Sequence, residues 1–206
     1  ELDSYGIREV KKDKGFKHQF NITFIGRMIL DKMPEFLIEV YEYLKYKKFD
    51  VGVHYVGKGE LYEPIYKRVS ESGYLKDFYF HGWQHDDHEI GSILFCSDII
   101  VNPGYLGLSI NHAFCFDTPI ISFEQTETGP FHSPEIEYIT NGVNSFLVEN
   151  KDLKLFKETI ELYLNDSKKQ DEVKKEIRQT VNTSMKPAIM VNGINKAIKY
   201  VIRNER

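Results

Sequence analysis

The chain has 206 residues, enough for one domain with a hydrophobic core. Hydrophobic residues make up 41% and charged residues 28% of it, a balance typical of globular rather than disordered proteins. Basic side chains number 27 and acidic ones 31, and the resulting net charge of −4 argues against a nucleic-acid-binding protein. Residues 1–150 carry 14 basic and 23 acidic side chains, whereas residues 151–206 carry 13 and 8, so a basic tail follows an acidic body.

Short apolar runs alternate with amphipathic stretches along the chain. The runs are almost entirely apolar, as in strands that helices cover on both faces. Such alternation predicts repeated βαβ units and therefore an α/β fold with a Rossmann-like, doubly wound parallel sheet. We expect strands at 21–25, 51–56, 78–80, 99–102, 119–123 and 145–148, and helices at 33–46, 62–72, 89–96, 109–116, from Asp152 as N-cap onward, and at 188–201.

Three segments are predicted along the chain: a polar lead-in at 1–19, the α/β domain at 20–183 and a C-terminal amphipathic helix at 184–206. Cys96 and Cys115 stand in apolar runs, which predicts core thiols in a reducing compartment. No apolar run approaches the roughly 20 residues of a membrane span, and no signal peptide is evident, so we expect a cytoplasmic protein. The chain begins at Glu1 rather than Met, which predicts a fragment of a longer protein.

The residues just after the strands form the candidate binding rim. In doubly wound sheets, ligands bind beyond the carboxyl ends of the strands. Arg27 and Lys32 are the cations nearest that rim, and Ser109 lies at the start of a helix whose free N–H groups favour an anion. These features predict a phosphate or diphosphate site. Glycines that let a ligand approach the backbone recur at the strand ends: Gly26, Gly57, Gly82, Gly104 and Gly107.

Six motifs occur in a fixed order between residues 20 and 200. They are FIGR at 24–27 with Lys32, VGKG at 56–59, FHG at 80–82, SDIIVNP at 97–103, GL at 107–108 continuing to DTPII at 117–121, and PEI at 134–136 with NGVNSFLV at 141–148. In this order they resemble the C-terminal, donor-binding half of GT-B glycosyltransferases of family 4. The resemblance implies a retaining hexosyltransferase that uses a nucleotide-diphospho-sugar, in polysaccharide or glycolipid biosynthesis.

The resemblance also implies roles for individual residues. Arg27 and Lys32 would stabilise the diphosphate leaving group, helped by the backbone N–H groups of Leu108 and Ser109. The base of the nucleotide would lie near Gly57. The remaining implied donor contacts are Gly26, Gly82, Trp83, Gln84, Gly104, Tyr105, Gly107, His112 and Glu135. No metal and no cofactor besides the nucleotide-sugar substrate are implied. The acceptor, a glycan or a lipid-linked glycan, would bind mostly to a missing N-terminal domain, so this chain alone is expected to be inactive.

The sequence departs from the family at two positions. Family members carry two glutamates eight residues apart, which here fall on Gly104 and His112. The PGYLGLS run at 103–109 resembles a subset of the family with P-G-N-x-G-L-T, so we interpret the departure as a subfamily trait. His112 is either a partner for a ribose hydroxyl or a buried core histidine. Glu135 is either a donor contact or a solvated loop carboxylate, and Asp117 stands where the family has glycine.

Two further features leave alternatives open. His81, His85, His88, Asp86 and Asp87 form either a metal site or, as we favour, a strand end followed by a helix N-cap. The helix at 188–201 has one apolar side and several cations, typical of a helix on an anionic membrane. We favour its packing against the sheet or the missing domain.

Two other functions fit the same residues. The missing glutamates allow a non-catalytic nucleotide-binding or regulatory α/β domain. Another GT-B enzyme, such as a nucleotide-sugar epimerase, is a further alternative.

Overall fold

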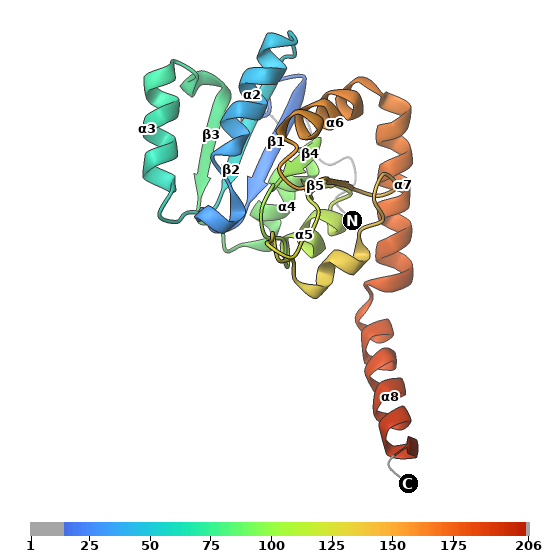
Figure 1. The fold of residues 1–206 in the computed structure, drawn as a ribbon. Coiled ribbons are helices and arrows are strands. Elements are labelled where there is room, and N and C mark those ends of the chain that lie inside the picture. Colours follow the sequence, from blue (N-terminus) through green and yellow to red (C-terminus); the bar gives the residue numbers. More distant parts are fainter. Residues whose placement is uncertain (1–14, 205–206) are drawn as a thin grey trace.

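The computed structural model describes residues 15–204, and these form a single six-stranded parallel sheet between helices (Figure 1). The strand order is β3-β2-β1-β4-β5-β6, so the chain builds outward from β1 to one edge and then returns to build outward on the other side. The predicted doubly wound α/β fold is therefore confirmed. The strands are β1 (Phe20–Ile25), β2 (Val51–Val56), β3 (Phe78–Gly82), β4 (Ile99–Val101), β5 (Ile120–Phe123) and β6 (Phe146–Val148).

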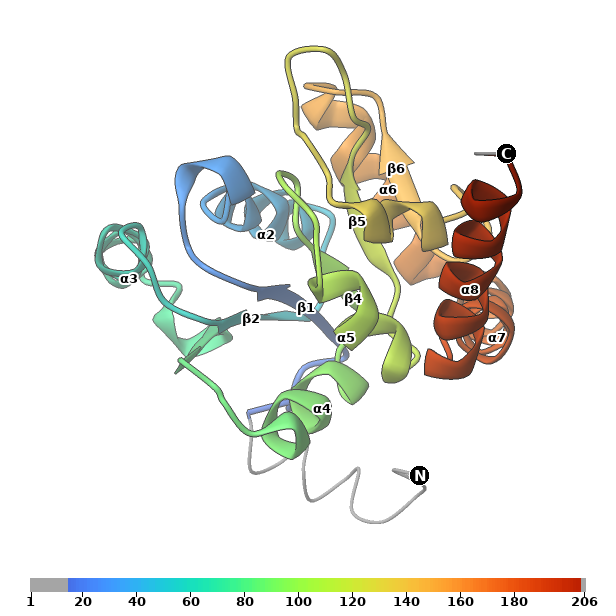
Figure 2. The same cartoon turned by 90° about the horizontal axis from the view of Figure 1, so that it is seen from below.

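Helices cover both faces of the sheet (Figure 2). The segments α2 (Phe36–Tyr46), α3 (Tyr62–Ser72) and α6 (Leu153–Asn165) lie on one face. The segments α4 (Asp87–Phe95) and α5 (Ser109–Cys115) lie on the other. Both faces of each strand are therefore buried, which explains the apolar runs of the sequence. The other helical segments are η1 (Leu30–Lys32), η2 (Leu75–Asp77), η3 (Pro134–Tyr138), α7 (Ser167–Ser184) and α8 (Pro187–Asn204).

Two helix starts differ from the prediction for local reasons. The helix expected from residue 33 begins at Phe36, because Met33 has a left-handed backbone (φ 52°) and ends η1. Helix α4 begins two residues early, because the Asp86 carboxylate accepts hydrogen bonds from the backbone N–H groups of His88 (2.7 Å) and Glu89 (3.2 Å). This N-cap accounts for Asp86, and residues 15–204 contain no group of three side chains placed to hold a metal ion.

Asp117, in the turn between α5 and β5, also has a left-handed backbone, with φ 57°. Its carboxylate accepts a hydrogen bond from Arg178 Nε of α7 at 2.7 Å. We expect Asp117→Ala to lower the free energy of unfolding by about 1–2 kcal/mol, because alanine keeps the backbone strain and loses the ion pair. Asp117→Gly should change it by less than about 1 kcal/mol, because relief of strain offsets the lost pair. Chemical denaturation of both variants checks this, and equal losses would contradict it.

Helix α8 extends away from the body of the domain beyond α7 (Figure 1). Its apolar side chains face solvent, with Ile194 60% and Ile198 51% exposed, so packing of this helix against the sheet is not observed. Its predicted packing against a missing domain and its contact with a membrane stay predictions. None of the helices within residues 15–204 is both long and apolar enough to cross a membrane.

Other predictions have mixed outcomes. Cys96 is buried, as expected, but Cys115 is exposed, because α5 turns Ile110, Ala113 and Phe114 toward the core instead. The core-thiol prediction is therefore wrong for Cys115. The predicted cap at Asp152 is confirmed, since its carboxylate accepts from the Leu155 N–H at 2.8 Å. Most of the predicted lead-in, residues 1–14, lies outside the described residues, and the predicted segment boundaries stay predictions.

Candidate functional site

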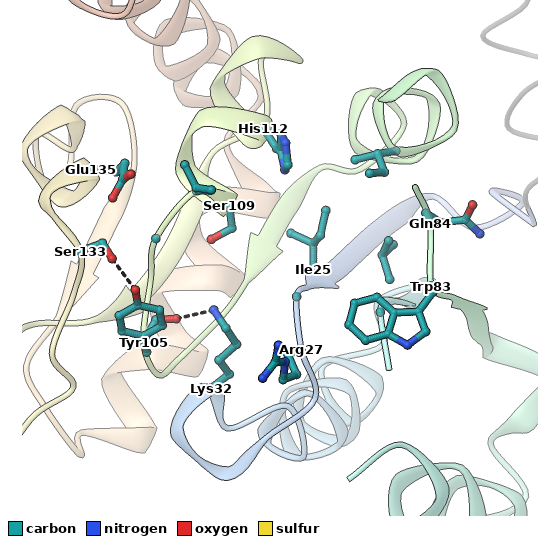
Figure 3. Close-up of a pocket in the computed structure, with 16 residues that line it drawn as sticks. Ile25, Arg27, Lys32, Trp83, Gln84, Tyr105, Ser109, His112, Ser133 and Glu135 are labelled. Atoms are coloured by element: carbon teal, nitrogen blue, oxygen red, sulfur yellow. Dashed lines mark hydrogen bonds between the residues drawn. The ribbon is translucent and has the colours of Figure 1, made fainter. Parts of the chain in front are cut away.

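A cavity of about 520 Å³ lies at the carboxyl ends of the central strands (Figure 3). Twelve of the fourteen predicted site residues line it: Gly26, Arg27, Lys32, Gly57, Trp83, Gln84, Tyr105, Gly107, Leu108, Ser109, His112 and Glu135. Gly82 and Gly104 do not. Four lining residues were not predicted: Ile25, Val56, Ile90 and Ser133. The fold thus brings nearly all the predicted rim residues together around one space.

Glycines let the strand ends approach one another beneath this cavity. A Cβ on Gly57, whose φ is +129°, would stand 2.0 Å from the carbonyl oxygen of Gly26. The Gly57 N–H donates to the carbonyl of Gly82 at 2.7 Å, so the ends of β1, β2 and β3 meet here. Gly82 therefore shapes the floor of the cavity without lining it.

Gly104 brings the loop after β4 against η1. A Cβ there would stand 2.0 Å from the carbonyl oxygen of Asp31, and the N–H of Tyr105 donates to that same oxygen at 2.8 Å. This contact places the Tyr105 carbonyl beside the next residue of η1, Lys32. Gly104 itself borders a second, more apolar pocket of about 700 Å³ on the other side of Tyr105.

Lys32 is held in the cavity by Tyr105. Its Nζ donates to the Tyr105 carbonyl at 2.9 Å and lies 4.8 Å from the centroid of the Tyr105 ring. Burial lowers the pKa of Lys32 from 10.5 to about 8, so the ammonium remains mostly protonated at neutral pH but is poorly solvated. Arg27 is more exposed and lies nearby on the same rim (Figure 3). The two cations make this end of the cavity attractive to an anion.

The wall on the α5 and η3 side carries polar atoms without partners. Ser109 Oγ and Glu135 Oε2 are buried and make no hydrogen bond to any described residue. Buried polar atoms of this kind are rare unless a ligand or water satisfies them. Tyr105 and Ser133 share a hydrogen bond between their hydroxyls beside them (Figure 3). His112 is exposed and lines the cavity, so its interpretation as a buried core histidine is wrong.

The opposite side of the cavity presents flat and polar groups after β3. Trp83 is 52% exposed and lies parallel to His85, with ring centroids 6.2 Å apart. The Gln84 amide donates to the His81 carbonyl at 2.8 Å, which fixes the loop between β3 and α4. An aromatic face at one end, cations at the centre and hydroxyl and carboxylate oxygens at the other suit a ligand with a ring, a charged middle and a hydroxyl-rich end.

Residues 7–180 match the protein family described as Glycosyl transferases group 1. This match covers most of the chain, so the protein belongs to that family. No curated protein is similar enough in sequence to count as a relative.

Solved structures of glycosyltransferases share the fold. HepE from Anabaena in complex with UDP superposes with a TM-score of 0.77 at 15% identity, over 94% of this chain and 52% of that one. TarM from S. aureus in complex with UDP gives 0.70 at 21%, over 85% and 34%. The C-terminal domain of LpcC from Francisella tularensis gives 0.71 at 22%, over 89% and 95%. The chain therefore spans about a third to a half of TarM and HepE.

Proposed function

We propose that this chain is the donor-binding domain of a retaining glycosyltransferase that moves a hexose from a nucleotide-diphospho-sugar to a glycan or lipid-linked acceptor. The observation that carries the proposal is the pair of cations at the strand ends, with Lys32 held 2.9 Å from the Tyr105 carbonyl and facing the cavity. Support also comes from the family and from HepE and TarM, whose structures contain UDP. The predicted cytoplasmic location and membrane contact stay predictions.

The chemistry requires stabilisation of a leaving group. As the bond between the sugar and the diphosphate breaks, negative charge grows on the diphosphate oxygens. Arg27 and Lys32 are placed to offset that charge, which lowers the energy of the transition state more than that of the bound donor. We therefore assign the role that a metal ion plays in other transferases to these two side chains. The base would pack beside Trp83, and the sugar would lie toward Glu135.

The acceptor and the second domain belong to this proposal too. The chain spans 52% of HepE and 34% of TarM, so a whole enzyme of this type has further residues to hold an acceptor. We expect this chain to bind nucleotide but to transfer no sugar by itself.

Binding of UDP tests the proposal directly. The chain contains one tryptophan, Trp83, and it lines the cavity, so its fluorescence should change as UDP binds. We expect Arg27→Ala to weaken UDP binding about tenfold or more, because one charged hydrogen-bond donor to the diphosphate is lost. Calorimetry gives the same affinities independently.

Arg68→Ala is the matched control, since Arg68 is an exposed arginine of α3 that does not line the cavity. It should bind UDP as the wild type does. Absence of UDP binding by the wild type, or equal binding by Arg27→Ala, would refute the assigned site.

The absence of glutamates at Gly104 and His112 favours one second candidate, a nucleotide-binding domain without catalysis. Both candidates predict UDP binding by this chain. They differ in a longer chain that includes an acceptor domain, where only the transferase releases UDP from a UDP-sugar in the presence of acceptor.

A further inference from the structure

The segment between β5 and η3 is fastened to the donor side of the cavity by one histidine. The Nδ1 atom of His132 accepts a hydrogen bond from the Leu106 N–H at 3.1 Å, and its Nε2–H donates to the Phe123 carbonyl at 2.9 Å. The ring therefore bridges the loop after β4 and the end of β5. Both bonds require a neutral ring with its proton on Nε2, because a protonated Nδ1 cannot accept.

The surroundings of His132 favour this neutral form. Burial lowers the pKa of His132, the hydrogen bond to the Phe123 carbonyl opposes that shift, and the charge of Lys32 lowers the pKa further. The imidazole thus keeps Nδ1 free to accept near neutral pH. The His132 backbone is held as well, since its N–H donates to the Gln125 side chain at 3.0 Å.

Two further bonds extend the same contact toward the cavity. The Ser133 N–H donates to the Leu106 carbonyl at 2.9 Å, and the Ser133 hydroxyl bonds the Tyr105 hydroxyl. Helix η3 starts at the next residue, so Glu135 stands in its first turn with its side chain at the cavity wall (Figure 3). Its Oε2 is buried and makes no hydrogen bond to any described residue.

Glu135 is the one carboxylate among the described residues that line the cavity. The two positions at which family 4 enzymes carry glutamates are Gly104 and His112 here, so neither supplies one. A carboxylate without a partner in a cavity accepts hydrogen bonds strongly, and the donors that a nucleotide-sugar offers on this side are hydroxyl groups.

We propose that Glu135 is the residue that accepts a hydrogen bond from a hydroxyl of the donor, and that His132 is a positioning residue that holds it there. The inference rests on the proposed function, because the hydroxyl is one of a nucleotide-sugar. The ribose and the transferred sugar both carry such hydroxyls, and the two probes UDP and UDP-glucose distinguish them.

The first experiment measures the affinity of Glu135→Ala for UDP and for UDP-glucose by calorimetry. We expect a loss of about tenfold for UDP-glucose, the size typical of one charged hydrogen bond. An equal loss for UDP identifies the ribose, and unchanged UDP binding identifies the transferred sugar. Glu137→Ala, which removes an exposed carboxylate of the same η3 helix, should bind both as the wild type does. Wild-type affinities in Glu135→Ala would overturn the proposal.

The second experiment tests whether His132 acts through Glu135. His132→Leu removes the acceptor at Nδ1 and should weaken binding as much as Glu135→Ala. His132→Asn should restore most of the affinity, because its Oδ1 can accept the Leu106 N–H. Combining His132→Leu with Glu135→Ala should cause no further loss, since both remove the same contact.

Three outcomes would overturn the role of His132: wild-type affinity in His132→Leu, a loss in folded His132→Asn as large as in the leucine variant, or losses that add in the double variant. Thermal melting of each variant shows that it is folded. A wild type that binds UDP, with binding lost in Arg27→Ala, keeps the proposed function intact even when these outcomes refute the positioning role.

Discussion

Gly57→Ala is expected to lower the free energy of unfolding by at least about 3 kcal/mol, the range of the most damaging single substitutions. The added Cβ would stand 2.0 Å from the oxygen and 2.9 Å from the carbon of the Gly26 carbonyl. Both atoms belong to the backbone at the end of β1, so no side chain can move to relieve the clash. The φ of +129° adds strain, because side-chain-bearing residues avoid this region.

Chemical denaturation checks this prediction, with Gly73→Ala as its control. Gly73 also has a positive φ, +78°, but a Cβ there meets nothing within 4 Å. Its replacement should therefore cost only the backbone strain, about 1–2 kcal/mol. If both variants unfold at the same denaturant concentration, the close approach of β1 and β2 does not set the requirement for glycine.

The second large effect concerns pH. The affinity of the wild type for UDP is expected to fall as the pH rises above about 8, the pKa of Lys32 in the free protein. A diphosphate binds the protonated ammonium better than the neutral amine, so binding raises this pKa again. Between the two pKa values the affinity should fall by up to about tenfold per pH unit. Below pH 7 the lysine is protonated in both states and contributes no slope.

Lys32→Arg is the decisive variant, because an arginine stays charged throughout this range. Its UDP affinity, measured by calorimetry from pH 7 to 9, should lack the slope that Lys32 causes, and it also controls for titration of the nucleotide. Lys32→Ala should likewise lack the slope but bind at least about tenfold more weakly at pH 7. The same slope in the wild type and in Lys32→Arg would exclude Lys32 as its source.

The sheet was predictable from sequence because burial on both faces leaves an unbroken apolar run for each strand. Residues 51–56 show this, since all six side chains of β2 are buried. Local backbone geometry was harder to predict. Met33 takes a left-handed conformation at a residue type that rarely does so, and the apolar pattern around it reads as a continuous helix.

The site divides in the same way. Gly26, Arg27 and Lys32 follow a strand directly, so the position of the strand predicts their place in the fold. Ser133 and His132 reach the cavity through bonds to Leu106, about 26 residues earlier in the chain, and no local pattern announces such a pairing. The one signal available was the PEI motif at 134–136, which marked Glu135 but not the two residues before it.

Helix α8 has a consequence for work with this chain in solution. The side that carries Ile194, Ile198 and Val201 faces water, and such an apolar stripe favours association between copies as concentration rises. The cationic side chains of the helix, Lys196, Lys199 and Arg203, oppose this at low ionic strength, but added salt screens their repulsion. The colloidal behaviour of the chain is therefore set by a helix that lies outside the nucleotide cavity.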